Sequence, residues 1–222
     1  MRLRAVALTG FVFVYLVVAF TEVPHGTWDA WAIWNGTARL LAYNDVLTVW
    51  REAALPHADY PPLLSLLVAG GYRLAGGYSV AVPILLHGAV YAAVMGLLRG
   101  KLWVLMLTGA VCLPYALIQF ADLPLALCFL LSAVLYKGGE QVWTGVALGV
   151  GLLVKNEGLL MALVFVGVSL AWERQVVWKM FAGLLPFVAA LLLFRALGNT
   201  TNDVVGAGGA LERVLDTRRW AV

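Results

Sequence analysis

The sequence predicts an all-α fold, a polytopic membrane bundle of about seven transmembrane helices with interfacial helices in a large first outer loop. Two observations predict this class. Of the 222 residues, 63% are hydrophobic and only 12% are charged, and the mean hydropathy is +0.90. The apolar residues form several runs of roughly 17–25 residues, the length that crosses a hydrocarbon layer about 30 Å thick.

Charge and cysteine content argue against other classes. The formal net charge is +3, and the basic residues lie in short segments between apolar runs rather than in one patch. This distribution gives no indication of a nucleic-acid partner. Cys112 and Cys128 fall inside apolar runs without the spacing of a metal site, so we expect buried free thiols.

The first apolar run, Ala5–Phe20, follows Arg2 and Arg4. No small-residue cleavage motif precedes Glu22, so this run is predicted to be a retained first span rather than a cleaved signal peptide. The two arginines place the N-terminus in the cytoplasm by the positive-inside rule. The next segment, residues 22–77, is then a loop on the outer side.

Two helices are predicted in this outer loop. The segment Ala30–Tyr43 carries apolar side chains at three- and four-residue spacing, which predicts a helix lying along the interface with Asp29 near its start: Trp31, Trp34, Ala38 and Leu41. A second helix is expected after Pro62, over Leu63–Leu74. Its twelve residues would reach only about 18 Å, so it is predicted to be interfacial or re-entrant.

The remaining spans follow from apolar length and basic loops. Three are predicted at residues 78–98, 102–120 and 123–136, which puts three basic residues inside: Arg99, Lys101 and Lys137. A last outward span is predicted at Val176–Leu197. With two further spans between these, the N-terminus is inside and the C-terminus outside.

The apolar stretch Val142–Trp172 is too long for one straight span, because 31 residues would measure roughly 46 Å. Lys155-Asn156-Glu157-Gly158 lies at its middle, where an ion costs about 2.5–3.5 kcal/mol. A break at this point is therefore predicted to give two short spans. The alternative is one long tilted helix, which would place Arg174 and Lys179 outside.

This topology defines a transmembrane module at residues 1–198 and an extracytoplasmic tail at residues 199–222. The chain is expected to be a multi-pass protein of the plasma (inner) membrane with its active face extracytoplasmic. The topology rests on apolar length and basic residues, yet it brings the chemically interesting side chains to one outer side: Asp29, His57, Asp59, Asp122, Lys155 and Glu157.

Four short motifs occur in order along the chain: Trp28-Asp29, then HADYPP at 57–62, ADLPLA at 121–126 and KNEG at 155–158. This pattern resembles the GT-C superfamily of polyprenyl-phosphate-sugar glycosyltransferases, in particular the protein O-mannosyltransferase and lipid A aminoarabinose transferase branch. The resemblance covers about residues 1–198, the N-terminal seven-span module of that family.

The resemblance implies a membrane enzyme that moves a sugar from a polyprenyl-phosphate carrier to an acceptor on the outer face, with inversion at the anomeric carbon. Asp29 matches the acidic residue of the first outer loop that acts as catalytic base. Partial burial beneath tryptophans would raise the pKa of such a base usefully. The expected substrate-binding residues are Lys155, Glu157, Asp122, Asp59, His57, Tyr60, Trp28 and Trp31.

The sequence departs from that family in two respects. Many members carry an acidic pair in the first loop, whereas Ala30 follows Asp29 here, and relatives usually continue for several more spans. A second membrane subunit could supply the missing C-terminal half. The alternative function is therefore a catalytically silent subunit that binds lipid or a partner in a membrane complex. A transporter is disfavoured, because only His87 is ionisable near mid-membrane and paired repeats are absent.

Each candidate also has a structural alternative. Asp29 and Asp122 are good helix N-caps, Asn156 and Glu157 could cap the next helix, and Lys155 could extend to lipid headgroups. The tryptophans are typical of a membrane-interface belt. No cofactor is required, but a divalent cation held by some of four residues stays open: Asp29, Asp59, Asp122 and His57.

Overall fold

The computed structural model describes residues 2–52, 55, 57–172 and 174–198. Within these ranges the regular secondary structure is all helical and contains no strand, as the sequence predicts. There are ten α-helices and one π-helix in this part of the chain: α1 (Arg2–Thr21), η1 (Ala30–Asn35), α2 (Gly36–Tyr43), α3 (Val46–Glu52), α4 (Leu63–Leu74), α5 (Ala81–Leu97), α6 (Leu102–Leu117), α7 (Asp122–Lys137), α8 (Gln141–Val154), α9 (Glu157–Trp172) and α10 (Arg174–Leu197).

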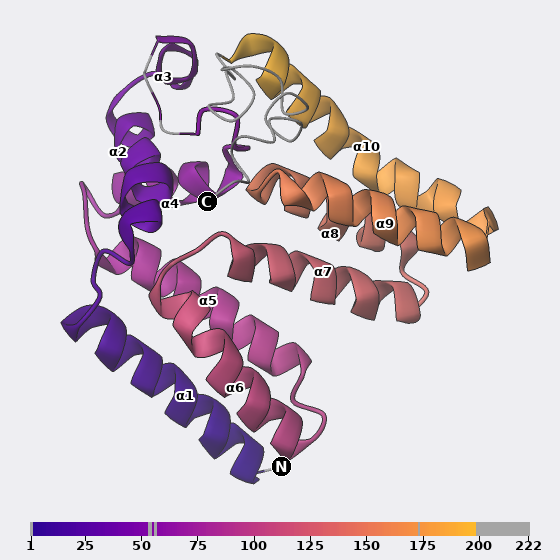
Figure 1. The fold of residues 1–222 in the computed structure, drawn as a ribbon, viewed down its shortest axis with the longest axis horizontal. Coiled ribbons are helices and arrows are strands. Elements are labelled where there is room, and N and C mark those ends of the chain that lie inside the picture. Colours follow the sequence, from indigo (N-terminus) through magenta and orange to yellow (C-terminus); the bar gives the residue numbers. More distant parts are fainter. Residues whose placement is uncertain (1, 53–54, 56, 173, 199–222) are drawn as a thin grey trace, which may run out of the picture.

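The long helices form two packed groups (Figure 1). Helices α1, α5 and α6 pack together, and two tyrosine hydroxyls bind backbone oxygens between them: Tyr15 donates to Ile84 O at 2.7 Å and Tyr91 to Gly109 O at 2.8 Å. Helices α7 to α10 form the second group, and α5 contacts α7. Burying each phenol with a bonded hydroxyl avoids the cost of an unpaired polar group in an apolar interior.

Successive long helices reverse direction, so alternate ends gather on two sides of the molecule. The C-terminal ends of α1, α6, α8 and α10 lie on the side of α2, α3 and α4, together with the N-terminal ends of α5, α7 and α9 (Figure 1). The opposite ends carry exposed basic residues: Arg2, Arg4, Arg99, Lys101 and Lys137. The short helices α2 to α4 thus cover one end of the bundle.

Among the residues that the structure describes, two helices are long and apolar enough to cross a membrane by length and composition. These are α1, with hydropathy 2.2, and Val177–Leu197 of α10, with hydropathy 2.1. Five other apolar helices are shorter, between 10 and 17 residues: α4, α5, α6, α8 and α9. The seven-span topology therefore stays a prediction.

The predicted break at Lys155 is confirmed, since α8 ends at Val154 and α9 begins at Glu157. Lys155 itself is extended, with φ −156° and ψ 153°. The predicted helix Leu63–Leu74 is also confirmed as α4, whereas α3 has no counterpart among the predicted helices.

The predicted helix Ala30–Tyr43 exists, but its first part is a π-helix, which alters the face that is buried. Trp34, Ala38 and Leu41 are buried. Trp31, predicted on the same helix face, is 48% exposed and does not share their burial. A π-helix takes more residues per turn than an α-helix, because its hydrogen bonds run from i to i+5, and this shifts the side chains out of the 3.6-residue pattern.

Small residues let α8 and α10 approach closely. A Cβ atom on Gly145 would overlap the backbone carbonyl of Met180, and one on Gly183 would overlap the carbonyl of Val142. Small residues at helix interfaces allow such backbone proximity in membrane proteins. The contact fixes α10, and hence its C-terminal end, against α8.

Gly145→Ala is therefore expected to destabilise the protein by about 1–3 kcal/mol, because the methyl group meets backbone rather than a movable side chain. Thermal unfolding of the detergent-solubilised protein measures the effect. The matched control is Gly167→Ala in α9, where a Cβ meets nothing within 4 Å. The control should be neutral or slightly stabilising, since alanine favours helix over glycine by about 1 kcal/mol. Equal melting temperatures for the two variants would contradict the close contact.

Candidate functional site

A lysine between two carboxylates lies where α7, α8 and α9 meet. Lys155 Nζ is 3.0 Å from Asp122 Oδ1 and 3.3 Å from Glu157 Oε1. The lysine side chain is 16% exposed, against 45% for Asp122 and 52% for Glu157. Burial lowers the pKa of Lys155, but the hydrogen bond and charge of Asp122, together with Glu157, outweigh it, so this pKa lies above its usual value. The lysine is thus a charged group at this junction.

The structure excludes three of the structural alternatives for these residues. Because Lys155 bonds to both carboxylates and is largely buried, it does not extend to the surface as a headgroup anchor would. The Asn156 side chain is used elsewhere and does not cap α9, and Asp122 lies inside the first turn of α7 rather than at its cap.

A second chain of polar contacts extends from Asn156. Its Nδ2 donates to Asp59 Oδ2 at 2.7 Å, and its Oδ1 accepts from Arg195 Nη2 at 3.0 Å. Asp59 is 5% exposed, and its other oxygen, Oδ1, has no hydrogen-bond partner among the described residues. Asn156 thus connects the segment at residues 57–62 to the last turn of α10.

Three side-chain rings stack beside these polar contacts of Asn156 and Asp59. Tyr60 lies between Trp34 and His57, with ring centroids 5.3 Å and 5.0 Å away and interplanar angles of 15° and 19°. His57 adopts a left-handed backbone with φ 52°, which turns the loop so that its ring meets Tyr60.

The electrostatic surroundings of Tyr60 show which charges lie near it. Burial raises the pKa of its hydroxyl, and Glu157 raises it further, whereas Lys155 lowers it; Asp59 and Asp29 also raise it. Four charged residues from three separate parts of the chain therefore act on one phenol.

Asp29 is held close to the start of α7 by a turn. Gly26 has φ +67°, and a Cβ there would lie 2.8 Å from Ile118 O and 3.1 Å from Gln119 Cβ. The amide of Thr27 donates to the same Ile118 oxygen at 3.4 Å. The segment before Asp29 is thus packed against the α6–α7 connection, which ends at Asp122.

The Asp29 side chain is exposed and makes no hydrogen bond or ion pair with a described residue. Its backbone is already helical, with φ −61° and ψ −44°, and it makes no capping bond, so the capping alternative does not apply. The expected burial beneath tryptophans is wrong, because Trp28 and Trp31 are 67% and 48% exposed and turn outward.

A buried pair of side-chain amides joins the end of η1 to the α6–α7 connection. Asn35 Nδ2 donates to Gln119 Oε1 at 3.1 Å, and the two residues are 4% and 0% exposed. Gln119 has φ 58°, so the connection before α7 is held in a conformation that few residues adopt.

The candidate metal ligands do not converge. In the part of the chain that the structure describes, no three His, Cys, Asp or Glu side chains lie together so as to hold a metal ion. Asp59 and Asp122 are instead bound to Asn156 and Lys155, respectively. Cys112 and Cys128 are free thiols, as expected, but only Cys128 is buried, and Cys112 is half-buried.

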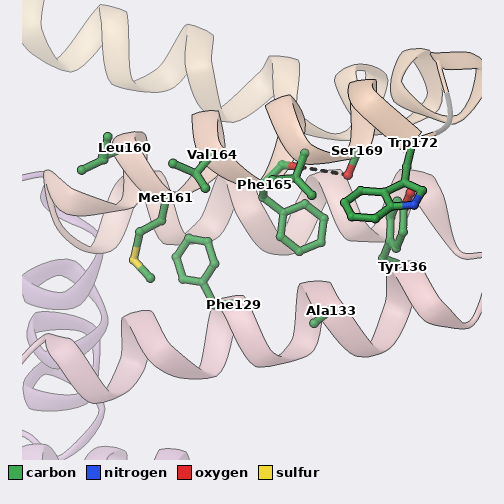
Figure 2. Close-up of a pocket in the computed structure, with 10 residues that line it drawn as sticks. Phe129, Ala133, Tyr136, Leu160, Met161, Val164, Phe165, Ser169 and Trp172 are labelled. Atoms are coloured by element: carbon green, nitrogen blue, oxygen red, sulfur yellow. Dashed lines mark hydrogen bonds between the residues drawn. The ribbon is translucent and has the colours of Figure 1, made fainter.

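An apolar groove of about 540 Å³ runs between α7 and α9 (Figure 2). Figure 2 shows Leu160 and Met161 toward one end and Tyr136 and Trp172 toward the other, with Phe129 and Phe165 between them. Because Leu160 and Met161 follow Glu157 by three and four residues, the groove begins one helical turn from the Lys155 junction.

Comparison of the chain with protein-family models, with curated proteins and with solved structures found no match in any of the three.

The structure brings most of the predicted site residues together, and it leaves two of them apart. Direct contacts join Lys155 to Asp122 and Glu157, and His57 to Tyr60. The charges of Asp29, Asp59, Lys155 and Glu157 act on the Tyr60 hydroxyl. Trp28 and Trp31 lie on the exposed surface. Sequence reasoning missed two members of the cluster, Asn156 as a connector and Arg195. Arg195 could have been noticed as a cation at the end of the apolar run Val176–Leu197 that the predicted topology places outside, where the positive-inside rule disfavours a cation.

Removal of the connector should weaken the whole cluster. Asn156→Ala leaves the buried Asp59 carboxylate without its donor, which costs about 1–3 kcal/mol and would lower the melting temperature by about 2–12 °C for a chain of this size. The control is Asn44→Ala, whose exposed amide donates only to Leu40 O. A shift no larger than that of the control would show that the contact between Asn156 and Asp59 contributes nothing.

Proposed function

We propose that this chain is a membrane glycosyltransferase that takes a sugar from a polyprenyl phosphate and transfers it to an acceptor hydroxyl on the outer face of the membrane. The observation that carries the proposal is the gathering of Asp29, Asp59, Asp122, Glu157, Lys155 and Arg195 at one end of an apolar helical bundle, at the mouth of an apolar groove. A lipid-linked substrate needs a polar site for its phosphate and sugar, next to an apolar groove for its prenyl chain.

The proposed orientation is multi-pass, in the plasma (inner) membrane, with α2 to α4 outside. It is supported by the exposed basic residues at the opposite end of the bundle, since Lys and Arg favour the cytoplasmic side. Seven long helices that alternate in direction would then span the bilayer, with α4 lying at the outer interface. The short helices α5 to α9 would fit a locally thinned bilayer.

Lys155 and Arg195 are the groups proposed to hold the donor phosphate. An ammonium carries three N–H donors, and Asp122 takes one of them at 3.0 Å. The side of the ammonium that faces the more exposed Glu157, at 3.3 Å, is proposed to turn to a phosphate oxygen. The Arg195 guanidinium gives one bond to Asn156 Oδ1 and keeps further donors. The prenyl chain would lie in the groove between α7 and α9, which begins one turn below.

Asp29 is proposed as the general base. Asp59, Asp122 and Glu157 are each bound to a side chain, whereas Asp29 has no partner among the described residues and its oxygens can accept a proton. The acceptor oxygen forms a bond to the anomeric carbon while the bond from that carbon to the phosphate oxygen breaks. The hydroxyl proton passes to the Asp29 carboxylate, and the electron pair leaves with the phosphate. Direct displacement of this kind inverts the anomeric centre.

One observation favours a second function. Lys155 is already neutralised by two carboxylates, as in a purely structural ion pair. A catalytically silent subunit, which binds a lipid or a partner subunit through the same surface, needs no more than this. The two functions differ in whether Asp29 contributes to turnover.

The orientation predicts the labelling of single cysteines in intact cells. With Cys112 and Cys128 replaced by alanine, Asn44→Cys in the outer loop should react with a membrane-impermeant maleimide, because residue 44 is exposed. Gly100→Cys, exposed at the basic end, should react only after the cells are lysed. Efficient labelling of Gly100→Cys from outside would reverse the orientation.

Catalysis predicts a specific effect of Asp29→Asn. Asparagine keeps the size of the side chain but cannot take the proton, so turnover should fall about 10²–10⁴-fold while the melting temperature is unchanged. The measurement is transfer from polyprenyl-phosphate sugars to candidate acceptors by the purified protein, with any subunit that co-purifies.

Lys155→Ala is the companion variant, and it should weaken donor binding, whereas Lys155→Arg should retain part of it. Full activity of Asp29→Asn would show that Asp29 is not the general base and would leave Asp59 and Asp122 as the candidates. Absence of transfer by the wild type with every donor, together with unaltered lipid binding in Lys155→Ala, would support the silent subunit.

A further inference from the structure

An arginine continues the core-facing side of α1 at the basic end of the bundle. The positions four, seven and eleven residues after Arg4 lie on its helix face, and they pack into the core that α1 shares with α5 and α6: Leu8, Phe11 and Tyr15. Arg4 itself is exposed, so it lies at the edge of this core rather than within it. A cation thus occupies the first turn of a helix face that packs against other helices.

A cavity of about 350 Å³ lies beside Arg4, and a second arginine lines it from another part of the chain. Its described lining consists of two cationic and two apolar side chains: Arg4, Arg99, Ala5 and Leu8. Arg99 belongs to the connection between α5 and α6, which Figure 1 shows beside the start of α1. Because Leu8 also packs on the core, the cavity extends from an apolar inner surface to two guanidinium groups.

The charges around the cavity favour an anion. Neither Arg4 nor Arg99 makes a hydrogen bond or an ion pair with another residue that the structure describes. At this end of the described chain, Glu140 is the only carboxylate beside five exposed cations: Arg2, Arg4, Arg99, Lys101 and Lys137. Two like charges that line one cavity repel each other, and an anion between them removes the repulsion. Phosphate suits the position, because guanidinium groups bind its oxygens in a planar, bidentate manner.

An apolar groove next to the cavity indicates that the phosphate belongs to a lipid. The groove measures about 560 Å³, lies between α1 and α6 on the neighbouring face of α1, and has an entirely apolar described lining that includes Leu3, Val6, Leu102 and Met106. Leu3 and Val6 are 64% and 67% exposed, although they flank Arg4 in the first turns of α1. Basic pockets between helices at the cytoplasmic side of membrane proteins bind anionic lipid headgroups. A soluble phosphate would not require the groove.

We propose that Arg4 and Arg99 form a binding site for the phosphate of an anionic phospholipid at the basic end of the bundle, which is the inner leaflet in the proposed orientation. The phosphate oxygens accept hydrogen bonds from both guanidinium groups, and an acyl chain lies along the apolar groove between α1 and α6. The site shares with the proposed function only the requirement that the chain lie in a bilayer. By neutralising both arginines, the lipid holds the start of α1 against the α5–α6 connection.

The test is lipid binding by the purified full chain in detergent, measured by native mass spectrometry with equal amounts of phosphatidylglycerol and phosphatidylcholine. The wild type should retain phosphatidylglycerol preferentially. Arg4→Gln and Arg99→Gln should each lower its binding constant about tenfold, the loss of one charge-assisted hydrogen bond. Neither variant should lower the melting temperature of the lipid-free protein, because both side chains are exposed and each substitution removes one of two like charges.

Arg2→Gln and Lys101→Gln are the matched controls, since each removes an exposed positive charge at the same end from a residue that does not line the cavity. Both should bind phosphatidylglycerol as the wild type does. Equal binding of the two lipids, or an equal loss in Arg2→Gln and Arg4→Gln, would overturn the proposal. Displacement of phosphatidylglycerol by millimolar inorganic phosphate would also overturn it, by assigning the site to a soluble phosphate compound.

The outcome is separable from that of the proposed function, because lipid retention is measured without a sugar donor or an acceptor. A chain that transfers no sugar but keeps the selectivity for phosphatidylglycerol, with the loss in Arg4→Gln and Arg99→Gln, would support this site while contradicting the transferase. Active transfer by a chain that binds both lipids equally would do the reverse.

Discussion

The ion pairs of Lys155 are the interaction on which the end of the bundle next to α2, α3 and α4 depends. An ammonium group that is only 16% exposed in an apolar protein is tolerated where counter-ions and hydrogen bonds surround it. Asp122 opens α7 and Glu157 opens α9, so both carboxylates come from helix starts, where negative charge is favoured by the helix dipole. The same charge explains why α8 ends at Val154, since a continuous helix would carry the lysine into the middle of an apolar run.

The junction also determines how the remaining parts of the site are placed. Asn156 follows Lys155 directly, and through it Asp59 of the outer loop and Arg195 of α10 are fixed relative to the same point. Small residues hold α10 against α8, so a displacement of the last helix would strain both the helix contact and the contact with Asn156. Asp29 takes part in none of these bonds, and it lies on a segment packed against the α6–α7 connection. A rigid set of bound charges beside one free carboxylate suits a site in which one group exchanges a proton.

Apolar run lengths and one internal charge cluster were sufficient to predict the long helices and the break at Lys155, because burial of apolar surface dominates where helices begin and end in such a chain. They also placed Asp29, Asp59, Asp122 and Lys155 at one end, as the structure does. Three features depended on tertiary contacts that periodicity does not report. The π-helix at Ala30–Asn35 turned Trp31 outward, the burial of Asp29 did not occur, and Arg195 joined the cluster through Asn156.

The balance of charge restricts how a phosphate could enter the proposed site. Asp29, Asp59, Asp122 and Glu157 give four negative charges against two positive charges from Lys155 and Arg195, so an added anion is repelled unless it replaces one of them. Glu157 is the group to be replaced, because it is the more exposed partner of Lys155 and the more distant, at 3.3 Å against 3.0 Å for Asp122. Its carboxylate can turn into water at small cost, since exposed ion pairs contribute about 0–1 kcal/mol. Asp122 would then keep the lysine in place while phosphate takes the position of Glu157, at the end of α9 from which the apolar groove descends.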